Sequence, residues 1–238
     1  MTARPLMLLR GDAANVLRDP LLAVVPFVPL GLWLLLRLAL PPAAALLSPA
    51  VDLTRWYPAV SAFLLLMTPL MIGMVAGFLL LDERDEGVLL SVSVTPVGKP
   101  GFVAYRLLVP TAAAFGMNLL LAGGLAPARV PLASVLLPAA VASLEAPMMT
   151  LYLAAFAANK VEGLVLVKAA SILDLAPLAP LFLPMPWQLA AGVLPTYWVA
   201  RSFLAMSAAD HVTSAVVGLL YHAALILLLA RRFAARPG

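Results

Sequence analysis

Cysteine is absent from the 238-residue sequence, and histidine occurs only at His211 and His222. Without cysteine the chain forms no disulfide, no thiolate metal site and no thiol nucleophile. Two histidines are too few for a histidine-rich metal centre, so we predict no resident metal. The phosphate-binding pattern G-x-x-x-x-G-K-[ST] is also missing, which excludes a P-loop ATPase within this chain.

Charge is scarce as well. Charged residues make up 11% of the sequence and hydrophobic residues 64%, with a mean hydropathy of +1.05. A soluble domain carries roughly a quarter charged residues, so this chain has too little polar surface to face water all round. We therefore predict an all-α membrane protein with one transmembrane domain over residues 1–238. The preference for arginine over lysine and the heavy use of Ala, Leu and Pro suggest a GC-rich, hence bacterial, genome.

Apolar runs of about 20 residues, the length that crosses a bilayer as a helix, predict six spans. They cover about residues 20–41, 58–81, 104–125, 131–157, 163–183 and 212–230. Residues 4–18 suit an N-terminal amphipathic helix in the interface, with a disordered charged leader as the alternative. Pro41-Pro42 is expected to end the first span. Residues 187–208 are interrupted at Pro195, which favours a broken re-entrant hairpin before span six over a full crossing.

The basic residues give the orientation. One side of the predicted topology collects eleven of them, namely Arg4, Arg10, Arg18, Arg84, Lys99, Arg106, Lys160, Lys168, Arg231, Arg232 and Arg236. The other side holds three, Arg55, Arg129 and Arg201. Positive charge concentrates in cytoplasmic loops, so both termini are expected in the cytoplasm of a bacterial cell with the chain in its inner membrane. The basic charge is thus explained by topology, and we predict no nucleic-acid partner.

The largest polar segment, LDERDEGVLLSVSVTPVGKPGFVAYR at residues 81–106, separates spans two and three. Its carboxylates Asp82, Asp85 and Glu86 come first, where a short helix would have its positive N-terminal end. Apolar residues follow, and Thr95-Pro96 predicts the end of the helix. We expect a short amphipathic helix over about residues 83–95, which either docks on a partner or lies on lipid headgroups.

This segment resembles the coupling-helix region of ABC-2-type transporter permeases, where an acidic stretch, a Gly-Thr-Leu-like start and a Thr-Pro pair followed by a basic residue recur. Arg18-Asp19-Pro20 resembles the elbow helix of that family running into its first span. Six spans with a broken hairpin before the last also match, so the resemblance covers essentially the whole chain. Val88 and Ser91 depart from the threonine and glutamate that are usual in the motif, which leaves the individual contacts to a partner open.

The resemblance implies a permease subunit of an ATP-binding-cassette exporter for a hydrophobic or amphipathic substrate such as a drug, lipid or polymer. The chain would be no enzyme and hold no cofactor, because two copies of a separate ATPase subunit would bind ATP and Mg²⁺. A second permease copy or a paralogue would complete the path. The docking residues implied by the resemblance are Glu83, Asp85, Glu86, Val88, Leu89, Val92, Thr95 and Pro96.

Two carboxyl groups lie inside predicted spans, Glu145 in span four and Asp174 in span five. A charged side chain at the centre of a spanning helix costs roughly 2.5–3.5 kcal/mol, so both are candidates for a cation-attracting or proton-exchanging site. The alternative is a structural role, with neutral or hydrogen-bonded carboxyls joining helices. Arg37 and His222 are possible partners, although His222 is typical of a packing residue.

Methionines recur in the same region of the sequence. Met67 and Met71 in span two and Met148 in span four are candidates for the substrate path, because methionine surfaces adapt to varied apolar ligands. Ordinary packing is the alternative for each.

A second function stays open at this stage, an ion-coupled secondary transporter that uses Glu145 and Asp174 and needs no ATPase. A P-loop ATPase encoded beside this gene would favour the exporter. An intramembrane hydrolase is disfavoured, since the sequence has no H-E-x-x-H motif and no evident Ser/His pair.

Overall fold

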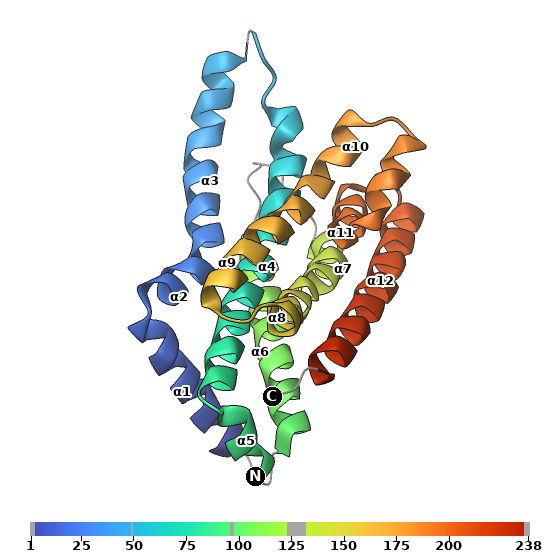
Figure 1. Cartoon of the computed structure of the whole chain (residues 1–238). Helices are drawn as coiled ribbons and strands as arrows, with labels where there is room; N and C mark the ends of the chain where they lie inside the picture. Colours follow the sequence, from blue (N-terminus) through green and yellow to red (C-terminus); the bar gives the residue numbers. More distant parts are fainter. Residues whose placement is uncertain (1–2, 49, 96–97, 123–131, 236–238) are drawn as a thin grey trace.

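The computed structural model describes residues 3–48, 50–95, 98–122 and 132–235, and every regular element in these ranges is helical (Figure 1). The α-helices are α1 (Ala3–Arg18), α2 (Pro20–Val24), α3 (Val28–Leu47), α4 (Tyr57–Asp85), α5 (Val88–Ser93), α6 (Gly98–Leu121), α7 (Leu132–Ala142), α8 (Glu145–Phe156), α9 (Lys160–Ala170), α10 (Ala179–Phe182), α11 (Pro195–Leu204) and α12 (Ala208–Ala234). Short 3-10 helices occupy Val25–Phe27, Thr54–Trp56, Ser171–Leu178 and Trp187–Val193. The predicted all-α class is confirmed.

Six helical segments of the described chain are long and apolar enough to cross a membrane. They are Pro20–Leu47, Thr54–Asp85, Gly98–Leu121, Ser134–Phe156, Lys160–Phe182 and Ala208–Ala234, in agreement with the six predicted spans. In Figure 1, α1 and α5 lie at one end of the molecule, and the connection from α3 to α4 lies at the other.

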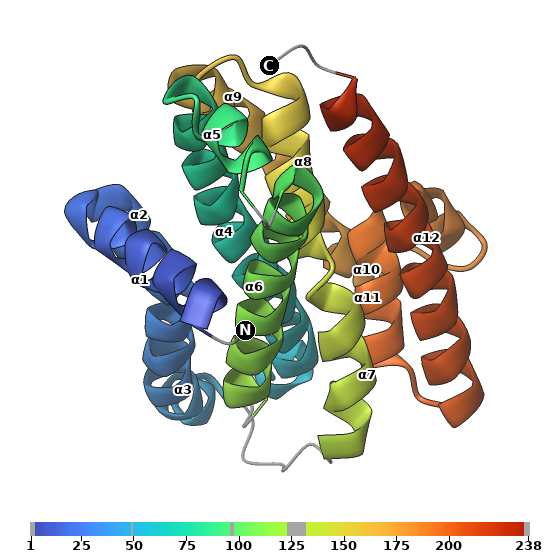
Figure 2. The ribbon, with the colours of Figure 1, turned by 90° about the horizontal axis from the view of Figure 1, so that it is seen from below.

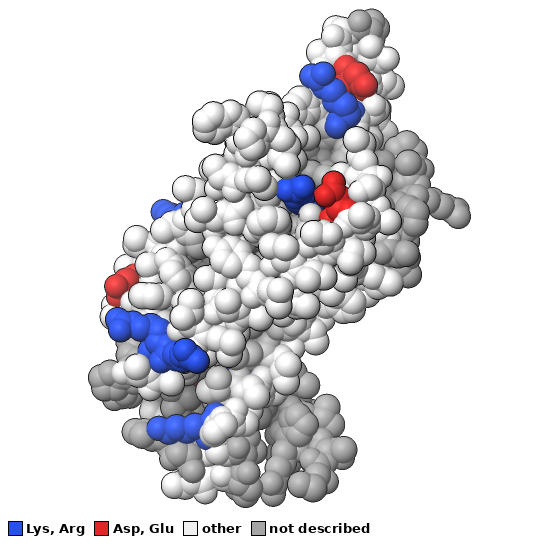
Figure 3. Space-filling view, turned by 90° about the vertical axis from the view of Figure 1, so that its right-hand side faces the viewer, with Lys and Arg blue, Asp and Glu red and all other residues white. Residues whose placement is uncertain are grey.

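The surface is as apolar as a lipid-facing protein requires. Figure 3 shows one face on which most side chains are uncharged and the charged ones form a few small groups. Large apolar side chains such as Leu38, Leu108 and Leu220 are more than half exposed, at 67%, 67% and 65%. In water an apolar surface of this extent would drive association, whereas hydrocarbon accommodates it.

Helix α4 is the centre of the bundle. Within its apolar segment 89% of the residues are buried, against 17–22% in the spans that contain α3, α6, α9 and α12. Figure 2 shows α4 beside α6 and α8, with α1–α3 and α12 on opposite flanks. An apolar helix without an amphipathic pattern belongs in such a position, because all its faces meet protein.

Two glycines let α4 and α8 pack closely. A Cβ placed on Gly73 would lie 2.4 Å from the carbonyl oxygen of Ala146, and one on Gly77 would lie 2.7 Å from Leu153 Cδ1. The hydroxyl of Thr150 donates to the Gly73 carbonyl oxygen across this contact at 3.1 Å. The spacing is the Gly-x-x-x-Gly pattern of close helix pairs in membranes, and here it fixes the central pair of the bundle.

The expectation that Pro41-Pro42 ends the first span is wrong. Helix α3 continues through both prolines to Leu47. Proline has φ near the helical value, and the alanines and leucines that follow are strong helix formers. Neighbouring groups satisfy the carbonyls freed by proline in a membrane helix, so the helix survives the two missing N–H groups.

Spans four and five are interrupted near their carboxyl groups. Helix α7 ends at Ala142 and α8 begins at Glu145, so the chain breaks directly before this carboxyl group. Asp174 lies in the 3-10 helix that follows α9. Residues 187–204 form two short helices as predicted, although their re-entry into a membrane stays a prediction.

Candidate functional site

The charged residues after span two contact other helices of the same chain. Helix α4 continues to Asp85. The next helix, α5, begins after Gly87, which has a φ of +70°. The expectation that Asp82 and Asp85 stand at the N-terminal end of a short helix is therefore wrong: they lie in the last turn of α4. Carboxylates are unfavourable at a helix C-terminus, so this turn requires nearby cations.

Arg106 of α6 supplies one of these cations. Its side chain is 5% exposed and donates hydrogen bonds to both Asp12 and Glu83. The Tyr105 hydroxyl donates to Asp12 as well, at 2.5 Å. A guanidinium suits this position because its donors reach two carboxylates at once. The group ties α1, α4 and α6 together immediately before α5.

Lys160 and Arg84 complete these links at the same end. The Lys160 ammonium lies 2.9 Å from Asp82 and 3.4 Å from Asp19, which caps α2. Arg84 donates to the carbonyl oxygens of Ala157 and Ala158 at 3.1 and 2.7 Å, just past the end of α8. Burial raises the pKa of Asp19, but hydrogen bonds from the Leu22 and Leu21 N–H groups and from Lys160 outweigh it and hold that pKa below its usual value.

Helix α5 packs against this end of the bundle. It covers residues 88–93, shorter than the predicted 83–95. Val88 and Val92 contact the cluster of Leu80, Phe102 and Ala154, so these two predicted docking residues face their own chain. Glu83 is likewise occupied by Arg106. The sequence of so short a segment predicts an apolar face but does not tell whether that face meets its own chain or a partner.

Three of the remaining predicted docking residues lie at the surface of the described chain. Asp85, Glu86 and Thr95 are exposed, and Val94 is 87% exposed. The side chain of Leu89 and the whole of Pro96 lie outside the described residues. The surface available to a partner is thus the set Asp85, Glu86, Ser91, Val94 and Thr95, which we call the α5 outer face.

In the centre of the bundle Glu145 is paired. Both Glu145 and His222 are fully buried, and Nε2 of His222 lies 2.7 Å from Oε1 of Glu145. Nδ1 of His222 lies 2.7 Å from the Gly218 carbonyl oxygen, which can only accept, so Nδ1 carries a proton. A second proton must then lie between Nε2 and the carboxyl group, since two lone pairs would otherwise face each other. The pair is neutral overall, whichever group holds that proton.

Asp174 lies close enough to Glu145 for the two carboxyls to interact electrostatically. Its Oδ1 atom and Oε2 of Glu145 are buried with no hydrogen-bond partner among the described residues. Of the two possible partners, His222 contacts Glu145, whereas the guanidinium of Arg37 lies 5.0 Å from the centre of the Trp33 ring. The two predicted carboxyls therefore lie within electrostatic range of each other, and His222 pairs with Glu145.

An apolar groove begins one helical turn from this pair. It has a volume of about 420 Å³ and is lined by α8, α9, the following 3-10 helix and α12, with Met148, Met149, Tyr152, Leu173, Leu225 and Leu229 among its walls. Met148 and Leu225 stand three residues after Glu145 and His222, the spacing that puts residues on one helix face. Met67 and Met71 do not line it; Met71 packs against the central core.

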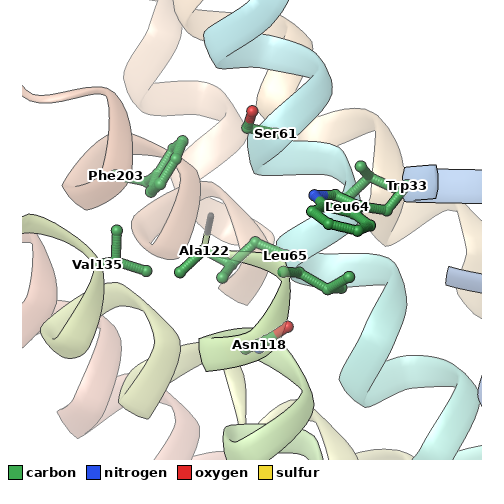
Figure 4. Close-up of a pocket in the computed structure, with 9 residues that line it drawn as sticks. Trp33, Ser61, Leu64, Leu65, Asn118, Ala122, Val135 and Phe203 are labelled. Atoms are coloured by element: carbon green, nitrogen blue, oxygen red, sulfur yellow. The ribbon is translucent and has the colours of Figure 1, made fainter. Parts of the chain in front are cut away.

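A second, smaller pocket lies near the start of α4 and the end of α6, away from α5. Figure 4 shows the side chains that line it. Trp33, Ser61, Asn118, Val135 and Phe203 bring side chains to it from α3, α4, α6, α7 and α11. In Figure 4 the nitrogen edge of Trp33 faces the space between these helices. Asn118 is fully buried.

Comparison of the sequence with known proteins identifies the family of this chain. The sequence model of the family described as "Fluoroquinolones export permease protein Rv2686c-like" matches residues 12–230. The fluoroquinolones export permease proteins MT2760 and Rv2686c, from two strains of Mycobacterium tuberculosis, are each 36% identical over 246 residues, covering 95% of this chain and 92% of the relative. The chain belongs to this family. No solved structure matches it.

Membership in an export permease family agrees with the ABC-2-type resemblance of the sequence. The matched range contains Asp12, Glu83 and Arg106, the central carboxyls and both pockets. Sequence reasoning named Glu145, Asp174 and Met148 as candidates, and their roles stay predictions; it also predicted a short helix where α5 lies.

Three features were missed. The Gly73–Gly77 spacing was readable as a helix-pair signal, and Asn118 as a neutral polar residue within an apolar span. The role of Arg106 had no such signal, because its carboxylates lie 23 and 94 residues away along the chain.

Proposed function

We propose that this chain is the membrane subunit of an exporter whose ATP is hydrolysed by a separate subunit. The observation that carries the proposal is the family match over residues 12–230, which spans the six-helix bundle. The sequence has no P-loop of its own, so the energy source must lie elsewhere. Two ATPase copies, holding ATP and Mg²⁺, and a second permease copy would complete the assembly in a bacterial inner membrane.

The cargo that best suits the described pockets is a drug-sized amphipathic molecule, with fluoroquinolones as the class named for the relatives. A groove of about 420 Å³ falls within the size range of drug sites, and its wall is almost entirely apolar. Glu145 and His222 stand three residues before the lining residues Met148 and Leu225, and Asp174 directly follows the lining residue Leu173. Asp174 has no cation partner among the described residues, and we propose that it receives the positively charged part of a cargo molecule.

Helix α5 would receive the ATPase through its outer face. Val88 and Val92 hold α5 on Leu80, Phe102 and Ala154, which belong to α4, α6 and α8. Arg106 and Lys160 fix the adjoining turn of α4 to α1, α2, α6 and α9. A displacement of α5 by the ATPase would therefore move several helices together rather than bend a loose loop.

The family match leaves one other energy source to consider. Glu145 and His222 share a proton in a buried pair with Asp174 beside it, and this arrangement also suits an ion-coupled secondary transporter. Such a protein would need no ATPase, and the α5 outer face would have no partner.

Transport into inverted membrane vesicles separates the two functions. Vesicles holding this chain together with its proposed ATPase subunit should accumulate norfloxacin when ATP is added, and an imposed proton gradient without ATP should give no accumulation. Accumulation driven by the gradient alone, and abolished by Glu145→Gln, would establish the secondary transporter instead.

Two valine substitutions test the docking role of α5. Val94→Asp places a carboxylate on the exposed face, so it should weaken copurification of the ATPase at least tenfold, the factor for about 1.5 kcal/mol of lost apolar burial. Its melting temperature in detergent should stay at the wild-type value. Val88→Asp should instead lower the melting temperature, since Val88 packs against the bundle. An ATPase that binds Val94→Asp with unchanged affinity would remove the docking role.

A further inference from the structure

The pocket of Figure 4 contains polar groups that lack partners. Asn118 is 0% exposed, and neither its side-chain nitrogen nor its oxygen has a hydrogen-bond partner among the described residues. The indole nitrogen of Trp33 is also buried without a hydrogen-bond partner among the described residues. Buried polar groups in proteins are almost always hydrogen-bonded, because an unbonded amide in apolar surroundings is costly. A polar molecule or group therefore belongs in this pocket.

The donors of the pocket indicate which group that is. The Trp33 indole can only donate, the Asn118 amide offers two N–H donors and one acceptor, and the Ser61 hydroxyl can do either. None of the nine residues described as lining the pocket is charged. A surplus of neutral donors favours oxygen atoms that accept, as in a ketone or carboxyl group, over an ammonium or a metal ion.

The size of the pocket limits what enters it. Its volume of about 30 Å³ exceeds the 10–15 Å³ that one water needs and admits one or two oxygen atoms. A whole drug molecule does not fit. Leu65, Val135 and Phe203 form apolar walls around the polar groups, so only a small polar group of a larger molecule would enter.

We propose that this pocket binds the carboxyl oxygens of the exported molecule in the half of the path away from α5. Ser61 lies near the start of α4 and Asn118 near the end of α6, so the pocket is formed at the helix ends opposite α5. The inference rests on the proposed export function and names the part of the cargo that is recognised. Fluoroquinolones carry a carboxyl group, whose two oxygens match the one or two acceptor atoms that the pocket admits.

Binding of two matched compounds tests the pocket. The full chain in lipid nanodiscs is titrated with norfloxacin and with its decarboxylated derivative, and binding is measured by the fluorescence of the compounds. Asn118→Leu and Trp33→Phe should each weaken norfloxacin binding about tenfold, the factor expected for one lost hydrogen bond. Each should change binding of the decarboxylated derivative less than about twofold.

Thr68→Val is the control for removing a buried polar group. Thr68 is 0% exposed, but its hydroxyl donates to Leu64 of its own helix, and it does not line the pocket. Its norfloxacin affinity should equal that of the wild type. Trp33→Phe keeps an aromatic ring beside Arg37, so it remains informative if Asn118→Leu fails to fold.

The proposal is overturned if both compounds lose affinity equally, if the variants bind norfloxacin as the wild type does, or if the wild type does not bind it. The pocket would then hold water only. The titration contains no ATP and no ATPase, so it stands apart from the proposed export function. Loss of ATP-driven accumulation with compound-selective binding intact would contradict the export mechanism and leave the pocket assigned.

Discussion

Single residues decide how the end of the bundle near α5 is held. Arg106 is nearly buried between Asp12 and Glu83, and it is the guanidinium that makes these two carboxylates tolerable at that position. A buried ion pair is not in itself a large gain in stability, but removal of one partner leaves the other charge without compensation. Two carboxylates share this arginine, so its removal would leave both Asp12 and Glu83 without their cation.

Arg106→Leu should therefore destabilise the protein by about 3–5 kcal/mol. The measurement is the melting temperature of the purified protein in detergent. Arg106→Lys should lie between this variant and the wild type, because an ammonium keeps the charge but cannot hold two carboxylates in a fork. A leucine variant that melts with the wild type would show that the cluster contributes nothing to the fold.

The two central carboxyls should differ in their effect on transport. Asp174→Asn removes a charge that has no described cation partner, whereas Glu145→Gln alters a pair that His222 already neutralises. Uptake of a cationic cargo should fall about tenfold or more in Asp174→Asn, as expected for losing a charged contact, and less in Glu145→Gln. Uptake of a neutral cargo of similar size is the control. An equal loss for both cargoes would assign the carboxyls a structural role.

Among the elements, the pair formed by α4 and α8 determines the arrangement of the others. Gly73 and Gly77 stand four residues apart on α4 and meet Ala146, Met149 and Leu153 of α8. The contact at Gly73 is with backbone, which cannot move aside as a flexible side chain can. Because α4 is buried on nearly all sides, any separation of this pair disturbs every helix packed around it.

Gly73→Ala should therefore lower the melting temperature in detergent, since its Cβ would lie 2.4 Å from the Ala146 carbonyl oxygen. Gly116→Ala on α6 is the matched control, because nothing lies within 4 Å of its Cβ. There alanine should stabilise the helix by up to about 1 kcal/mol through its higher helix propensity. If the two variants shifted the melting temperature in the same direction, close packing at Gly73 would not be limiting.

For the whole molecule, the main question is which end faces the cytoplasm. The charged clusters of Arg106, Lys160 and Arg84 lie at the same end as α5. Basic residues concentrate on the cytoplasmic side of membrane proteins, so the orientation expected from the sequence places the α5 outer face where an ATPase could reach it.

The absence of cysteine makes this orientation directly testable. Single cysteines at Ser91 and Ala235 should react with a membrane-impermeant maleimide only after cells are opened. Cysteines at Ala50 and Ala209 should react in intact cells. All four positions are exposed on the described chain. Labelling of Ser91→Cys in intact cells would show that α5 faces the outside, which contradicts the expected orientation and the docking role of α5.

Composition and apolar run length were enough to predict the six spans and the all-α class, because hydrocarbon admits few backbone conformations. Glu145 and Asp174 were recognisable as well, since charge inside an apolar run is conspicuous. Where a helix ends was harder to predict: the prolines at 41 and 42 did not stop α3, and the acidic residues extended α4 rather than starting α5.

Only the tertiary structure decided which groups meet. The contacts described above join residues that are 14 to 94 positions apart along the chain. They are the contact of His222 with Glu145, those of Arg106 with Asp12 and Glu83, and the packing of Val88 against the cluster that contains Phe102. Asn118 without a partner is likewise a property of the packed bundle. Pairing of this kind depends on how helices are rotated against each other, and that rotation is set by close contacts such as Gly73 on Ala146, which one sequence read locally does not reveal.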